Sequence, residues 1–180
     1  MLRAGILLGV LLAGCQATTP TPLSVQPSPA SLEPTLGGLS TFTSEAWGFR
    51  LSYPHDWTVE SGRSDRFLPP DDSFGFSVAH VHPVPEFSSE AGFEKNSRAQ
   101  FAASGAELRS TTRYAVDGDD GLLSTYTFQV KGTDAIALDI AVYHSGIGYD
   151  ILITALGGRE QEQALRSVLD QIMRSFVWLE

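Results

Sequence analysis

The sequence predicts an α+β domain built around an antiparallel β-sheet, and three observations lead to that class. Apolar and polar residues alternate over 126–130 and 136–142, which is the period-two pattern of half-buried strands. Clusters rich in Gly and Asp separate these segments at hairpin spacing. An apolar stripe at helical spacing ends the chain. Strands joined by short turns favour antiparallel pairing, and the final helix needs a sheet to pack on.

Composition limits the chain to one ordinary domain with accessory segments. It has 180 residues, of which 42% are hydrophobic and 10% aromatic, enough to build a packed core. The formal net charge is -9, and a surface of this sign repels phosphate backbones. We therefore expect no nucleic-acid partner.

The amino terminus has the pattern of an export signal. A basic residue, Arg3, precedes the apolar run Ala4–Ala13, which is too short to span a bilayer because that requires about 20 residues. The run ends in Leu12-Ala13-Gly14-Cys15, which resembles the bacterial lipobox. The resemblance implies cleavage before Cys15 and attachment of diacylglycerol and fatty acids such as palmitate to that residue. An ordinary secretory signal with a chance cysteine is the alternative.

Residues 1–14 are thus predicted to be a lipoprotein signal peptide, and 15–40 the lipidated cysteine and a tether. The tether is rich in Pro, Thr and Ser and could extend to about 75 Å at roughly 3 Å per residue. Cys15 is the only cysteine, so no internal disulfide is expected. The predicted location is extracytoplasmic, on the cell membrane or the outer membrane, with the membrane contacted through lipid on Cys15.

The globular domain is expected over 41–180 and opens with short strands and a helix. The alternation of Phe49, Leu51 and Tyr53 predicts the first strand, which Pro54 ends. Two further strands are predicted at 57–59 and from 74 toward 80. A helix follows, capped by Ser88 or Ser89 and ended by Gly105, with one face formed by Phe93, Ser97 and Phe101.

The second half is predicted to be a meander followed by the final helix. Four strands are expected over 107–116, 121–131, 135–143 and 148–155. The turns between them are assigned to 117–121, 131–134 and 144–146. After Gly157-Gly158, the helical stripe consists of Ala164, Leu165, Val168, Leu169, Ile172, Met173 and Phe176.

Three segments together resemble the PsbP-like superfamily, which includes DcrB-type envelope proteins and small bacterial lipoproteins. They are Gly48–Trp57, with its Tyr-Pro step and tryptophan, the hairpin meander, and the final helix running into Arg174-Ser175-Phe176. The likeness covers 41–180. It implies an antiparallel sheet sandwiched between helices (an α/β/α sandwich), used to bind other macromolecules and without a shared catalytic site. Photosystem members of the superfamily dock partly through basic residues. This chain differs from them because its net charge is -9.

Candidate sites in the domain have ordinary structural explanations. His80 and His82 would point to the same face of a strand and could share a metal, but no third ligand is identifiable, so structural histidines are the preferred interpretation. The acidic stretch 117–121 lacks the further ligands of a calcium loop and is interpreted as a turn. Ser145 beside His144 is interpreted as a turn dipeptide rather than a positioned pair.

The sequence contains no Gly-x-Ser-x-Gly elbow and no phosphate-binding glycine loop. We therefore expect no catalytic residues, no metal and no cofactor. The predicted function is that of a noncatalytic, membrane-anchored binding or adaptor module of the cell envelope, with an envelope protein as partner. Alternatives are a small-ligand or metal carrier near His80 and His82 and a hydrolase of unfamiliar type.

Overall fold

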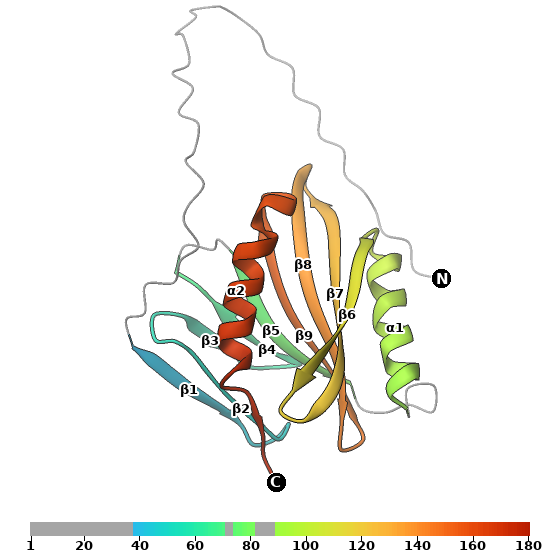
Figure 1. Cartoon of the computed structure of the whole chain (residues 1–180). Coiled ribbons are helices and arrows are strands. Elements are labelled where there is room, and N and C mark those ends of the chain that lie inside the picture. Colours follow the sequence, from blue (N-terminus) through green and yellow to red (C-terminus); the bar gives the residue numbers. More distant parts are fainter. Residues whose placement is uncertain (1–37, 71–73, 82–88) are drawn as a thin grey trace, which may run out of the picture. The chain divides into compact units, whose positions relative to one another are not determined.

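A computed structural model of the chain describes residues 38–70, 74–81 and 89–180. Cys15, the predicted signal peptide, nearly all of the predicted tether, and His82 lie outside these residues. The described part contains two antiparallel sheets and two α-helices (Figure 1). The α+β class and the antiparallel sheet are therefore confirmed.

The larger sheet has seven strands. Their spatial order is β3 (Thr58–Glu60), β4 (Ser64–Leu68), β5 (Phe74–Val81), β9 (Ile147–Leu156), β8 (Thr133–His144), β7 (Asp119–Val130) and β6 (Glu107–Val116). The smaller sheet has the order β1 (Leu39–Ser44), β2 (Phe49–Pro54) and β10 (Val177–Trp178). The helices are α1 (Glu90–Ala103), the 3-10 helix η2 (Gly158–Gln161) and α2 (Glu162–Met173).

The three hairpin turns of the meander each have two residues, fewer than the five, four and three predicted. They are Asp117-Gly118, Lys131-Gly132 and Ser145-Gly146, and all six residues have positive φ. Two-residue turns with positive φ at both positions match the right-handed twist of the flanking strands. The strands therefore continue into residues that the sequence assigned to turns, including Asp119 and His144.

The main core lies between the large sheet and α2. Alternate β8 residues Ile136, Leu138 and Ile140 are fully buried on this face, as are Leu165 and Leu169 of α2. The small sheet covers the same face, because the ring of Phe49 stacks on Phe176 with centroids 5.4 Å apart. This continuous apolar layer is the largest stabilising element that the described residues show.

Helix α1 covers the opposite face of the sheet. Ser97 donates from its hydroxyl to Asp139 Oδ2 on β8 at 3.0 Å, and Asp139 points away from the main core. The ring of Phe101 stacks on Tyr126 of β7, with centroids 4.2 Å apart. Figure 1 shows the two helices on different sides of the sheet. Only a few apolar side chains hold α1, and a buried polar strip lies beneath it.

Several elements were not predicted. Strands β1, β4 and β10 are absent from the sequence-based assignment, and α2 ends at Met173 rather than continuing to Phe176. The chain leaves the helix after Met173, with Arg174 as the cap, yet Phe176 is still only 3% exposed because it packs from the following segment. Apolar spacing therefore identified a core residue correctly but gave it the wrong backbone conformation.

We expect Gly148→Ala to destabilise the fold, because a Cβ at this β9 position would overlap the Phe93 ring of α1. Overpacking of this kind costs about 2 kcal/mol. Urea unfolding would measure the change. The matched control is Gly75→Ala on neighbouring β5, where a Cβ would make an ordinary contact 3.6 Å from the Thr154 hydroxyl. Equal losses of stability in both variants would contradict close packing of α1 on β9.

Candidate docking surface at the hairpin end

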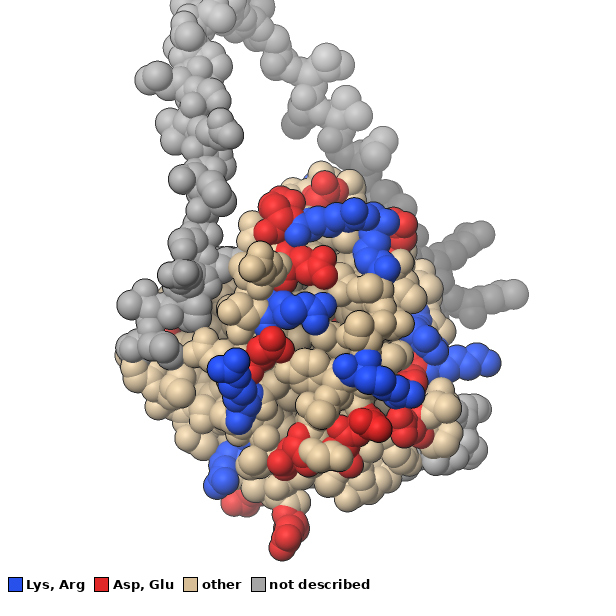
Figure 2. Space-filling model, in the orientation of Figure 1, with Lys and Arg blue, Asp and Glu red and all other residues tan. Residues whose placement is uncertain are grey.

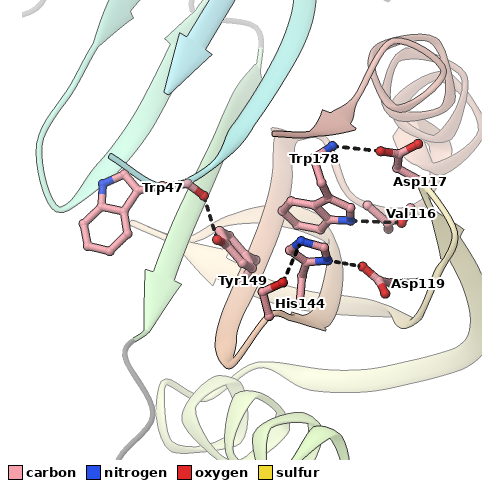
Figure 3. A network of polar contacts seen from close by, with 8 residues as sticks. Trp47, Val116, Asp117, Asp119, His144, Tyr149 and Trp178 are labelled. Carbon is pink, nitrogen blue, oxygen red and sulfur yellow. Dashed lines mark hydrogen bonds and ion pairs between the residues drawn. The ribbon is translucent and has the colours of Figure 1, made fainter. Parts of the chain in front are cut away.

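Four segments that are distant in the sequence meet at one end of the described domain. They are the β1–β2 turn with Trp47, the β6–β7 turn with Asp117, the β8–β9 turn with Ser145, and β10 with Trp178 (Figure 3). We call this region the hairpin end and define it by Trp47, Asp117, Asp119, His144, Ser145, Tyr149 and Trp178.

Strand β10 is held at this end by specific hydrogen bonds. The Trp178 backbone N–H donates to Asp117 Oδ2 at 2.8 Å, and its indole Nε1 donates to the Val116 carbonyl at 3.3 Å. The N–H of Leu179 donates to the Gly48 carbonyl at 2.8 Å. These bonds join the chain's last strand to the β6–β7 hairpin and to the β1–β2 turn, so the position of the Trp178 ring is fixed from several directions.

His144 is the centre of the polar network. Its Nδ1 lies 2.6 Å from Asp119 Oδ2, and its Nε2 lies 3.1 Å from Ser145 Oγ. The imidazole also stacks on the Trp178 indole, with centroids 4.2 Å apart and planes 6° from parallel. Figure 3 shows the imidazole beside the Trp178 indole, with Asp119 at the edge of the ring. Contacts at both nitrogens and on a ring face leave the imidazole a single orientation.

Tyr149 and Trp47 extend the network toward β5. The Tyr149 hydroxyl donates to the Trp47 carbonyl at 2.7 Å, and burial raises the pKa of this phenol. The Trp47 indole stacks on His80 of β5, with ring centroids 3.1 Å apart. Tyr149 also packs against Trp178, with centroids 4.8 Å apart. Tyr149, Trp178 and His144 thus form one aromatic layer, to which Trp47 is joined through its carbonyl.

The aromatic layer is partly open to solvent. Trp47 and Trp178 are each half-buried, and the side chains of His144 and Asp119 are 26% and 34% exposed. Partly exposed Trp and Tyr side chains with fixed positions are enriched at protein interfaces, because they bury a large area at a small entropic cost. The geometry therefore suits recognition of another macromolecule.

Charges of both signs are mixed on the face drawn in Figure 2, where Lys and Arg are interspersed with Asp and Glu. This face carries no continuous basic stripe of the kind that follows a phosphate backbone. Shape and aromatic area, more than net charge, distinguish the hairpin end.

The predicted site residues have different outcomes. Cys15 and His82 lie outside the described residues, so lipid attachment and the two-histidine pair remain predictions. His80 is half-buried on the core side of β5, as its strand parity predicts, and stacks on Trp47. Within 38–70, 74–81 and 89–180, no group of three or more His, Cys, Asp or Glu side chains could hold a metal ion.

The acidic stretch 117–121 is divided between two elements. Asp117 and Gly118 form the turn, whereas Asp119, Asp120 and Gly121 belong to β7. Asp117 Oδ2 and Asp119 Oδ2 contact Trp178 and His144. These two carboxylates therefore stabilise the hairpin end through hydrogen bonds, which favours the turn interpretation over the calcium loop.

Ser145 lies in the β8–β9 turn, as predicted, but its hydroxyl contacts the His144 imidazole, which was not expected from the sequence. Ser145 has φ of 47°, and this left-handed backbone turns its hydroxyl back onto the preceding imidazole. Asp119, which contacts the other nitrogen of His144, is placed there by the strand register. Extending the pairing of Gly121 with Val142 by two residues puts Asp119 opposite His144. A two-residue turn at Lys131-Gly132 would have given this register from the sequence.

A separate cavity lies at the other end of the sheet. Its volume is about 660 Å³, and its lining includes Arg109, Gln129, Asp134 and Arg159. Arg109 pairs with Glu107 at 2.9 Å, and Gln129 donates to Asp134 at 2.9 Å. This cavity is not lined by His80, so it gives no support to a ligand site near that histidine. Among the described helices, none has both the length and the apolar character needed to cross a membrane.

No family model and no curated protein matches the sequence. Similar solved structures do exist. A protein from Bacteroides thetaiotaomicron shares 20% identity and a TM-score of 0.52, covering 78% of this chain and 48% of that one. This chain thus spans about half the length of that protein.

For two further solved structures, the region similar to this chain spans nearly the whole of the other protein. The cyanobacterial PsbP protein (CyanoP) from Synechocystis has 17% identity and a TM-score of 0.53 over 78% of this chain and 92% of that one. The Ran-binding protein Mog1p from Saccharomyces cerevisiae has 8% identity and a TM-score of 0.58 over 79% and 96%. At these identities the likeness shows the fold, which is PsbP-like, while function must be argued from the site.

Proposed function

We propose that this PsbP-like chain is a noncatalytic, lipid-anchored binding module of the cell envelope. In this account residues 1–14 are a cleaved signal, Cys15 carries the lipid, and the segment to residue 40 is a tether. The globular domain over 41–180 then works on the outer side of the cell membrane or outer membrane. Its hairpin end binds an envelope protein.

The fixed aromatic layer of the hairpin end is the observation that carries this proposal. Trp178 and His144 are held by contacts with three separate segments, so little side-chain freedom remains to be lost on binding. A preorganised Trp or Tyr can contribute 2 kcal/mol or more, by the order of magnitude seen at interface hot spots. That the same fold is found in a protein named for binding Ran also supports a binding role.

We expect Trp47→Ala to reduce capture of the partner at least about tenfold, because the variant removes a half-buried indole from the hairpin end. The full lipidated chain would be crosslinked in intact cells, affinity-purified and analysed by quantitative mass spectrometry. Leu156→Ala is the matched control, since Leu156 is 53% exposed on β9 at the other end of the sheet. Equal capture by all three proteins would contradict docking at the hairpin end, and capture of no envelope protein would contradict the proposed function.

A further inference from the structure

We infer that Ser145 is an activated hydroxyl nucleophile that accepts acyl groups from small activated esters. The inference goes beyond the proposed function, in which this surface only binds a partner. It rests on the contacts that join Asp119, His144 and Ser145 in one line (Figure 3).

The direction of the hydrogen bonds follows from the chemistry of the groups. An ionised carboxylate can only accept, so the 2.6 Å contact with Asp119 places the imidazole proton on Nδ1. When the ring is neutral, Nε2 then carries a lone pair that faces the Ser145 hydroxyl at 3.1 Å. This is the order of roles in Ser-His-Asp sites: the carboxylate orients the base, and the base accepts the hydroxyl proton.

The supporting structure keeps this line in place. Asp119 projects from β7 and His144 from neighbouring β8, while the Trp178 indole covers one face of the imidazole. Ser145 is exposed at the turn, so a reagent can reach its Oγ. Ser104 is also exposed, but its hydroxyl donates to the Phe101 carbonyl at 2.7 Å. Its proton is therefore directed to a backbone oxygen and not to a basic side chain.

The proposed reaction has two balanced steps. Ser145 Oγ attacks the ester carbonyl carbon, and its proton moves to His144 Nε2. The bond from the carbonyl carbon to the leaving oxygen breaks, the proton passes to that oxygen, and an alcohol departs from the acylated serine. Water then attacks the acyl carbon with His144 as base, which releases the carboxylic acid and restores the hydroxyl.

The surroundings define the substrate class. The 660 Å³ cavity and a smaller one beside Ser52 and Gln171 are both lined by other residues, so neither holds an acyl chain near Ser145. Gly146, which follows the nucleophile, lies in the two-residue turn outside the strand ladder, so the backbone around Ser145 is open. Small esters with good leaving groups therefore fit this open site better than long-chain substrates.

The full chain would be tested with p-nitrophenyl acetate and with a fluorophosphonate probe followed by peptide mass spectrometry. We expect one probe per chain on Ser145 and ester turnover above that of the Ser145→Gly variant. Glycine accepts the positive φ of this position, so the variant removes the hydroxyl while preserving the turn. Asp119→Asn should slow both reactions at least tenfold, because it disturbs the tautomer of the imidazole. Ser104→Ala should react like the wild type.

Three results would overturn the inference. The first is no labelling of the folded wild-type chain. The second is labelling of Ser104 or other serines at the same rate as Ser145. The third is ester turnover that persists in Ser145→Gly but is lost in His144→Gln, since this would place the nucleophile on the imidazole. The binding proposal is tested separately through Trp47, which takes no part in the contacts among Asp119, His144 and Ser145.

Discussion

Replacing Cys15 with Ala is expected to move the protein from the membrane fraction to the soluble extracytoplasmic fraction. Lipid on this residue is the proposed anchor, and each buried methylene contributes about 0.8 kcal/mol. A single acyl chain gives reversible attachment, but two or three anchor stably. Loss of the thiol removes the diacylglycerol and blocks lipoprotein processing, so the change should be nearly complete.

Membrane flotation and mass spectrometry of the amino-terminal peptide would measure this result. Thr18→Ala, three residues further along the proposed tether, is the matched control and should stay with the membrane. Retention of the Cys15→Ala variant at the wild-type level would show that another feature holds the chain there. Detection of an unmodified Cys15 in the mature protein would contradict lipid attachment at this residue.

Asp150→Asn is expected to raise the free energy of unfolding at pH 8 by up to about 3 kcal/mol. Asp139 on β8 is 1% exposed beneath α1, and burial together with the charge of Asp150 raises its pKa well above the usual value. Burial raises the pKa of Asp150 to about 6. One oxygen of each carboxyl has no hydrogen-bond partner among the described residues, so the ionised forms are poorly compensated.

The pH dependence follows from the sign of these shifts. A carboxyl whose pKa is higher in the folded state than in the unfolded one favours folding when protonated. The stability from Asp150 is fully present below about pH 4 and is lost as the pH rises through about 6. Asp139 changes stability in the same direction. At about 1.4 kcal/mol for each pKa unit, the shift of Asp150 from 3.8 to about 6 gives the stated magnitude.

Urea unfolding at pH 4.5 and pH 8 would test this prediction. Asp150→Asn and Asp139→Asn should both stabilise at pH 8 and have much smaller effects at pH 4.5. Asp120→Asn is the matched control, because this β7 carboxylate is exposed to solvent. If the two variants were less stable than wild type at pH 8, the carboxylates would have to be compensated there by favourable interactions.

Local periodicity was sufficient to predict much of the fold. The alternation of Ile136, Leu138 and Ile140 gave β8 and its core face, and the stripe from Leu165 to Met173 gave α2. Strand β4 could not be found in this way, because its buried residues include Asp65, which accepts from Ser44 at 3.2 Å. A polar residue satisfied by a distant partner does not appear as apolar alternation.

The candidate site was less predictable because its parts come together through tertiary structure. Trp47 and Trp178 are 131 positions apart in the sequence, and both contact Tyr149, an arrangement that depends on the pairing of β10 with β2 over two residues. Asp139 was also not recognised as buried. Its position alternates with the apolar face of β8, and only the packing of α1 removes that second face from water. Asp119 opposite His144 was predictable, had the turn length been assigned correctly.

The central claim, that the domain binds an envelope protein through its hairpin end, is tested most directly by site-specific photocrosslinking in intact cells. A photoreactive amino acid would be placed at exposed Ala46 in the β1–β2 turn and, in a second protein, at Leu156 on the opposite end of the sheet. The account predicts one defined protein adduct from position 46, reduced by Trp47→Ala, and none from position 156. An adduct with the same protein from position 156 alone would contradict it.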